Sequence, residues 1–354
     1  MLDHIDGEKS VRHDFITIDS HDILNQYELV FLDTADGVEN RTSRLWEEFL
    51  QDRGFLASDG RDPLQELFNV IQDEFARTYG EKLLVHLYRG FIVHTGTHKA
   101  MKHKEASRIF SEENVVYIDS LMESILFDYA IIFYLLGRFP NDVDIKSDGF
   151  ILALYMLNEC CRKGQFTDYD GSSLVIKIVN ERLDDSELCL ISDLYWCMLA
   201  FALCHELAHI YRHHFKKDVN ADSIMQEYDA DSAGYDIFLK LLMKNKGHTE
   251  NVISSIFQEY LYAAPMTLLL FYHCLFSTEY LLYGEKTGNT HPYPMDRITN
   301  LLDISEKPEY DFDNRDGNTV LHSYWDAMEY YISELDLKIK NHKLDDIIKK
   351  GKES

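Results

Sequence analysis

The sequence is poor in proline and glycine, with 6 and 17 among its 354 residues. Hydrophobic residues make up 45% of the chain and aromatic residues 13%. Disordered chains are poor in apolar residues and rich in proline and charge, so this composition excludes a largely disordered protein and favours a helix-rich globular one. A chain of this length can bury a large core, in one large domain or two moderate ones.

Positive charge is also scarce. Lys and Arg number 35 against 61 Asp and Glu, which gives a formal net charge of −26. Such a surface repels phosphate backbones and anionic lipids, so we expect no nucleic-acid partner. Most of the excess is interpreted as a solvated acidic surface. A basic or neutral protein fits it better as a partner, and a regulatory protein partner is one option.

Cysteine motifs and targeting signals are missing. The six cysteines form no CxxC pair and no secreted-type framework. The first residues lack the basic flank and apolar stretch of a signal peptide, so we expect a cytoplasmic protein. The apolar stretch 124–139 is too short for a bilayer, and the stretch 260–284 contains polar residues that are costly in lipid. We expect both to be buried core helices, without membrane association.

The residue pattern divides the chain into three regions. Residues 1–145 mix strand-like and helical runs, an α+β region of unknown role. Residues 146–302 contain long helical runs. Residues 303–354 contain an acidic loop, a helix and a lysine-rich tail. Strands are expected at 15–18, 27–33, 115–118 and 171–180; helices are expected at 43–51, 62–80, 149–163, from 192 or 193 to 215, from 220 or 222 to 247, over 250–284 with a break near Pro265, and at about 320–340.

Phosphate-binding GxxxxGK[ST] and nucleophile GxSxG motifs are absent, but the sequence contains HELAH at 205–209. A helix advances about 100° per residue, which puts His205 and His209 about 40° apart on one face. Both imidazoles can therefore hold one metal ion. Glu206 is then placed to act on a metal-bound water as general base, as in zinc peptidases.

A catalytic zinc needs a third protein ligand and an open position for water. The next predicted helix offers Glu227, after a loop long enough to reverse the chain. Asp231, one turn further, can reach the outer nitrogen of a ligand histidine and fix its tautomer. Small residues suit close packing of this helix at the metal: Ala230, Ala233 and Gly234.

This combination resembles the gluzincin metallopeptidases, in which HExxH is followed on a second helix by a glutamate ligand and an aspartate four residues later. The EYDAD run is similar to the ExEAD pattern of the HtpX and CAAX-prenyl protease family, although Asp229 replaces the usual glutamate and clear membrane helices are missing. The resemblance covers about residues 200–302. It implies a zincin-like metallopeptidase core over 146–302, in which both helices lie beside a small sheet within a predominantly helical α+β fold.

The same family often has a downstream HP…R element, which THPYPMDRI resembles. The resemblance implies that Arg297 braces the site and that His291 or Tyr293 approaches the substrate. The alternative is an ordinary turn in which Pro292 and Pro294 lead into a helix.

A looser resemblance is to the Lit family of phage-exclusion proteases, which are soluble and have HExxH with another histidine shortly after. His214 takes that place here. The alternative for His213 and His214 is a favourable position at a helix C-terminus, where the dipole stabilises cations. Cys204 adjoins the motif but is expected to face away from His205 and to pack.

The sequence thus predicts a zinc-dependent endopeptidase that acts on a cytosolic protein or peptide. Zn²⁺ would be held by His205, His209 and Glu227, with Glu206 as general base and the oxyanion donor left open among Tyr228, His291, Tyr293 and Arg297. By analogy, the substrate would lie along a sheet edge, for which 174–179 is the candidate.

Three alternatives remain. A non-hydrolytic zinc-binding interaction module is disfavoured by the open fourth position, since structural zinc is normally closed by four protein ligands. A helical scaffold without metal requires the spacing of Glu227 and Asp231 to be a coincidence. A regulated, Lit-like phage-defence protease is a narrower form of the main hypothesis.

Overall fold

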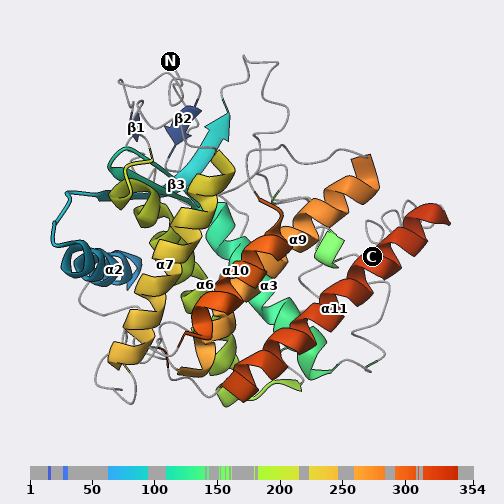
Figure 1. Ribbon diagram of the computed structural model, residues 1–354. Helices are drawn as coiled ribbons and strands as arrows, with labels where there is room; N and C mark the ends of the chain where they lie inside the picture. Colours follow the sequence, from blue (N-terminus) through green and yellow to red (C-terminus); the bar gives the residue numbers. More distant parts are fainter. Residues whose placement is uncertain are drawn as a thin grey trace.

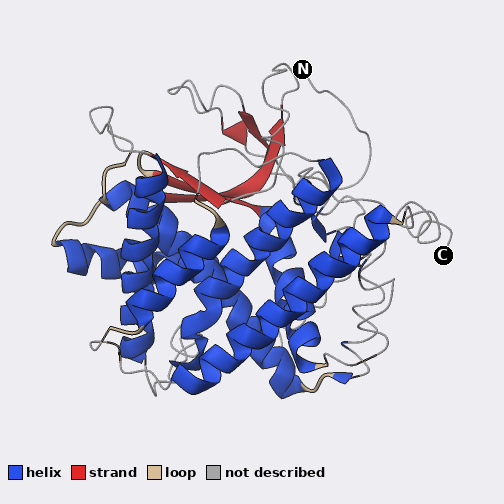
Figure 2. Ribbon diagram, turned by 45° about the vertical axis from the view of Figure 1, so that its right-hand side comes forward, coloured by secondary structure: helices blue, strands red, loops and turns tan. Residues whose placement is uncertain are grey.

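The computed structural model describes residues 15–16, 27–30, 63–94, 109–139, 182–214, 223–245, 259–283, 292–307 and 314–341, with single positions from 142 to 179 and at 310. Long helices form the body of the molecule, and strands cover one end of it (Figures 1 and 2). The predicted class, α+β and predominantly helical, is confirmed.

The strands form one five-stranded sheet in the order β1-β2-β3-β5-β4. Neighbouring strands are antiparallel except for β3 and β5, which run parallel. β4 therefore lies at the edge of the described sheet, paired only with β5 in a tight hairpin. The strands are β1 (Phe15–Ile16), β2 (Tyr27–Val30), β3 (His86–His94), β4 (Ile109–Glu112) and β5 (Val115–Asp119). Three of the four predicted strands are confirmed by β1, β2 and β5.

The central element is the helix α6 (Asp185–Tyr211). Every residue from 194 to 204 has the apolar character of a core helix, and α2, α3, α7, α9 and β4 all pack against it. The prediction that it begins at Ser192 or Asp193 was wrong. Asp184 accepts hydrogen bonds from the backbone N–H groups of Ser186 and Glu187, and Glu187 caps Asp184 in return, so this capping box starts the helix earlier.

The other helices surround α6. They are α2 (Pro63–Tyr79), α3 (Ser120–Arg138), α7 (Ser223–Asn245), α9 (Ala264–Tyr283), α10 (Pro294–Ser305) and α11 (Asn314–Lys340), with the short 3-10 helix η3 (Glu259–Ala263) before α9. Pro265 lies in the first turn of α9, where its missing N–H would have no helical partner. The predicted break is therefore the junction between η3 and α9.

Two predicted boundaries at the C-terminal side and in the middle of the chain need correction. α11 begins at Asn314, so part of the predicted acidic loop is helical. Val179 is helical, which is incompatible with a strand at the end of 171–180, and most of that segment lies outside the described residues. The described positions from 151 to 161 are helical, as predicted, and the helix predicted at 43–51 lies outside the described residues.

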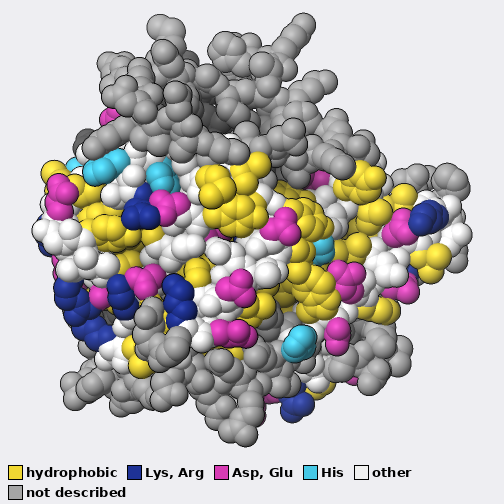
Figure 3. Space-filling view, in the orientation of Figure 1, with side chains coloured by type: hydrophobic (Ala, Val, Ile, Leu, Met, Phe, Trp, Pro, Cys, Tyr) yellow, Lys and Arg dark blue, Asp and Glu magenta, His cyan; other side chains and the backbone are white. Residues whose placement is uncertain are grey.

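Two helical stretches are long and apolar enough to cross a membrane by length and composition alone: Ser186–Tyr211 and Leu261–Leu282. Most residues of each are buried among the other helices, and core helices of soluble proteins pass the same test. On the face shown in Figure 3, acidic side chains are scattered among apolar and neutral ones and do not gather in one patch. This face therefore shows no concentrated acidic surface.

Candidate metal centre

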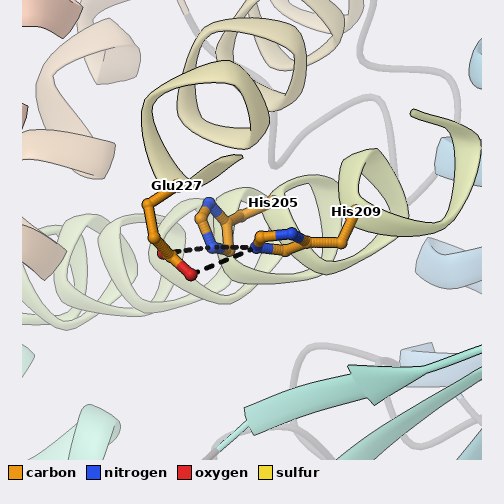
Figure 4. Close-up of side chains that lie close together, drawn as sticks. All are labelled: His205, His209 and Glu227. Atoms are coloured by element: carbon orange, nitrogen blue, oxygen red, sulfur yellow. Dashed lines mark hydrogen bonds and ion pairs between the residues drawn. The ribbon is translucent and has the colours of Figure 1, made fainter. Parts of the chain in front are cut away.

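Three side chains from two helices converge on one point: His205, His209 and Glu227 (Figure 4). The two histidines lie one turn apart on α6, and Glu227 comes from the beginning of α7. The two Nε2 atoms are 3.1 Å apart. The Glu227 carboxylate oxygens lie 3.3 Å from Nε2 of His205 and 3.5 Å from Nε2 of His209. The residues predicted as metal ligands are thus brought together in space.

The size of this triangle fits a metal ion. A tetrahedral site with metal–ligand bonds of about 2.0–2.1 Å has ligand atoms separated by roughly 3.3 Å. The three distances observed here are close to this value, although the two that end on Glu227 go to different carboxylate oxygens. His205 and Glu227 are buried, and the His209 side chain is only 12% exposed. Burying such groups together is costly unless a partner compensates for the lost hydration. Two imidazoles and a carboxylate are donors that zinc accepts.

Close approach of α6 and α7 makes this convergence possible. A Cβ atom built on Gly234 would lie 2.9 Å from the backbone C of Cys204 and from the backbone N of His205. Only glycine therefore allows α7 to rest directly on the α6 backbone at the first histidine. Gly234 follows Glu227 and Asp231 at the spacing of one helix face, so the same face provides both the carboxylates and the contact.

Asp231 and Arg297 hold the first histidine in place. The Nδ1 atom of His205 lies 2.9 Å from Oδ1 of Asp231, whose side chain is fully buried. Arg297 on α10 donates two hydrogen bonds of 2.7 Å to the same carboxylate, and its Nη2 is 3.9 Å from Glu227. Burial alone would raise the pKa of Asp231, but the Arg297 guanidinium and His205 lower it. A charged carboxylate thus directs Nε2 of His205 into the triangle.

The two histidines have opposite proton affinities without a metal. Burial lowers the pKa of His205, but the carboxylates of Asp231 and Glu227 outweigh this effect and raise it to about 10. Burial lowers the pKa of His209 to about 3, and the charge on His205 contributes. Without a metal, the site thus favours one protonated histidine and opposes a second.

Glu206, which follows the first histidine on α6, contacts the sheet. Ser111 on the edge strand β4 donates a hydrogen bond of 2.6 Å to its Oε2. Burial raises the pKa of Glu206, whereas His205 and the Ser111 hydrogen bond lower it. A carboxylate whose pKa is shifted upward is a better proton acceptor, which suits a general base.

The other residues predicted for the site have different positions. His291 lies outside the described residues. The Tyr293 hydroxyl is 2.9 Å from Nδ1 of His273, so it contacts α9 instead of the ligands. Cys204 is fully buried and is not in the ligand cluster. Arg297 donates two hydrogen bonds to Asp231, so it braces the site and is a poor candidate for the oxyanion donor.

Two residues near the site were not predicted from the sequence. One is Ser111, which comes from a distant strand. The other is Tyr272 on α9. Burial raises the pKa of its phenol most; Cys161 raises it further, Arg297 lowers it, and the carboxylates of Glu206 and Glu227 make smaller raising contributions. The charges of Glu206 and Glu227 thus act on the phenol of Tyr272. No local sequence signal distinguishes either residue, because packing alone brings them here.

Comparison with known proteins supports a protease. The model of the family described as peptidase U49 matches residues 174–314, a range that includes α6, α7, α9 and α10. The three residues of the triangle lie within this range, and so do Glu206, Asp231 and Arg297. Comparison with curated proteins and with solved structures found no match. The U49 match is compatible with the Lit-like resemblance, and the resemblance to HtpX stays a prediction.

Proposed function

We propose that this chain is a zinc-dependent endopeptidase with a zincin-like core. The observation that carries the proposal is the buried triangle of His205, His209 and Glu227, with Glu206 beside it. The match to a peptidase family over the same residues supports the hydrolytic part. The three protein ligands leave a tetrahedral ion one open position, as catalytic zinc requires.

When bound, zinc would lower the pKa of a water molecule and polarise the scissile carbonyl of a peptide. Glu206 would take the proton of that water at Oε1, while Oε2 keeps the Ser111 hydrogen bond. It would then pass the proton to the leaving amine, so that one carboxylate acts first as base and then as acid. Asp231 and Arg297 would hold His205 in one tautomer during both steps.

Tyr272 is our candidate for the donor to the developing oxyanion. Of the four earlier candidates, Arg297 donates to Asp231 and Tyr293 contacts His273, whereas His291 lies outside the described residues. Burial, Asp296 and Asp231 raise the pKa of Tyr228 and Arg297 lowers it, and Tyr228 is the remaining alternative. The carboxylates of Glu206 and Glu227 both raise the pKa of Tyr272, which supports a position of its hydroxyl on the side of the base and the third ligand, where an oxyanion donor must lie.

A substrate peptide would add to the sheet at β4. This strand is at the edge of the described sheet, packs against α6, and contacts Glu206 through Ser111. An extended peptide paired with β4 would bring its backbone close to the base. β4 replaces the segment 174–179 in this role, since Val179 is helical.

We favour hydrolysis over a zinc-binding interaction module because Glu206 adjoins the triangle without belonging to it. A structural zinc is normally closed by four protein ligands, and the cluster found among the described residues has three. A regulatory protein partner is a part of the proposal that depends on the acidic composition, whereas a cytosolic location and a role in phage defence depend on the Lit-like resemblance.

Removing the metal should abolish cleavage reversibly. We expect the purified protein to cleave members of a library of internally quenched peptides, to lose this activity on dialysis against a chelator, and to regain it with Zn²⁺. His209→Ala should stay inactive after the same addition of zinc, because the triangle loses a ligand. Cleavage that survives complete metal removal would exclude the proposed function.

Changing Tyr272 to Phe should slow catalysis without affecting the metal. Loss of one oxyanion donor lowers kcat by about 10²–10³-fold, so we expect a decrease of this order with KM and zinc content nearly unchanged. Tyr280→Phe is the matched control, since Tyr280 is exposed on the same helix. If Tyr228→Phe shows the large decrease in kcat and Tyr272→Phe does not, Tyr228 is the donor.

A further inference from the structure

The C-terminus of α6 folds His214 back against the second histidine of the motif. The N–H of His213 donates to the carbonyl of Ile210 at 3.0 Å, and the N–H of His214 donates to that of His209 at 3.0 Å. His213 adopts a left-handed φ of 59°. This is the Schellman arrangement, whose left-handed position usually holds glycine. In this helix ending, the residue after the left-handed position lies beside the residue five positions earlier. Here His214 therefore lies beside His209.

The resulting contacts form a chain of hydrogen-bonding groups. Nδ1 of His209 is 2.9 Å from Nδ1 of His214. Nε2 of His214 is 3.0 Å from Oδ2 of Asp229 on α7. Arg212 donates to both oxygens of Asp229, with an Nε–Oδ2 distance of 2.8 Å. The His214 side chain is only 8% exposed, so its own contacts are largely sheltered from water, whereas Arg212 and Asp229 are partly exposed.

One arrangement of protons satisfies the whole chain when His209 is a metal ligand. Its Nε2 must then be free of a proton, so Nδ1 carries one and donates to Nδ1 of His214. His214 accepts at that atom and therefore carries its own proton on Nε2. That N–H donates to Asp229, which Arg212 holds in place. Ligand histidines in metalloproteins usually donate their second N–H to a carboxylate, a backbone carbonyl or water, and here His214 takes this place.

We propose that His214, Asp229 and Arg212 form a second orienting arm of the metal centre, which positions His209 as Asp231 and Arg297 position His205. The proposal rests on the proposed function, in that His209 must be a zinc ligand. Both arms end in an aspartate of α7 that accepts from an arginine. The second arm differs in that a histidine lies between the ligand and the carboxylate. The three residues are positioning residues, since none belongs to the ligand triangle.

Zinc affinity tests the arm without relying on activity. We would measure it at one fixed pH by competition with a chromogenic chelator, for the full chain and its variants. His214→Ala should weaken zinc binding about 10- to 100-fold, the usual effect of removing such a partner. His214→Gln should recover part of this loss, because its amide oxygen can accept from Nδ1 of His209. Asp229→Asn should weaken binding less than His214→Ala.

The control is His213→Asn, which tolerates the left-handed conformation and lies next to the arm without being part of it. It should keep the zinc affinity of the wild type. A second readout is the visible absorption spectrum of the Co²⁺-substituted protein, which should change in His214→Ala and stay unchanged in His213→Asn. Thermal unfolding of the metal-free variants shows whether they fold; if His214→Ala does not, His214→Gln and Asp229→Asn decide.

The outcomes separate this proposal from the proposed function. If the wild type binds zinc, and His214→Ala has the affinity and the Co²⁺ spectrum of the wild type, the arm is wrong and the zinc site stands. If the wild type binds no zinc, the proposed function fails and the arm fails with it. Equal losses in His214→Ala and His213→Asn would also overturn the arm, because they would reflect the helix end as a whole.

Discussion

Glu206→Gln is expected to bind zinc as the wild type does and to lose peptide cleavage. Positioned general acid–base groups contribute about 10²–10⁴-fold to rate, and here one carboxylate serves in both proton transfers, so we expect a decrease in kcat near the upper end of this range. Zinc should stay bound because the Glu206 carboxylate lies outside the ligand triangle. The amide can still accept from Ser111, so the local fold should persist.

The measurement is cleavage of quenched peptides together with zinc content for the same preparation. Glu306→Gln, at the exposed end of α10, is the control for the loss of one negative charge and should cleave like the wild type. Ser111→Ala should show a smaller loss than Glu206→Gln, because it frees the base without removing it. If Glu206→Gln retains cleavage at the rate of the wild type, Glu206 is not the base.

Gly234→Ala is expected to destabilise the protein and to impair the metal site together. Its Cβ would lie 2.9–3.0 Å from backbone atoms of Cys204 and His205, which cannot move like the end of a flexible side chain. Overpacking of this kind costs about 1–3 kcal/mol or more in the free energy of unfolding. Alanine is a better helix former by about 1 kcal/mol, but only if the backbone fits. The steric term should therefore win.

An alanine at 234 would push α7 away from α6. This would move Glu227 and Asp231 away from His205, because both lie with Gly234 on the face of α7 that meets α6. Zinc affinity should fall along with the melting temperature. Met225→Ala, at an exposed position of the same helix, should leave both unchanged. A Gly234→Ala variant with the melting temperature and zinc content of the wild type would mean that the two helices are not in direct backbone contact here.

The parts of the site that could be predicted from the sequence lie within single helices. His205, Glu206 and His209 are fixed relative to one another by the helical repeat, as are Glu227 and Asp231. Joining the two groups required only that α7 pack against α6, for which the small residues around Gly234 were a usable signal. In the structure, Glu227 lies beside both histidines and Asp231 contacts His205, as the spacing predicts.

The remaining parts depend on tertiary packing or on a disguised local signal. Ser111 lies 95 residues from Glu206 along the chain, and only the position of β4 over α6 brings it there. Tyr272 is one of many tyrosines on apolar helices. His214 was singled out by the Lit-like resemblance, but its contact with His209 was not predicted, because His213 occupies a helix-ending position that glycine usually marks. The start of α6 was missed although its capping box, Asp184 to Glu187, was visible in the sequence.

The most direct test of this account is X-ray absorption at the zinc K-edge, measured on the purified protein together with its zinc content. We predict stoichiometric zinc in a shell of nitrogen and oxygen ligands at about 2.0–2.1 Å, with the scattering pattern of two imidazoles and no sulfur. Glu227→Ala should bind zinc much more weakly. A protein that binds no zinc, or a shell with sulfur at about 2.3 Å from a cysteine such as Cys204, would contradict the assignment.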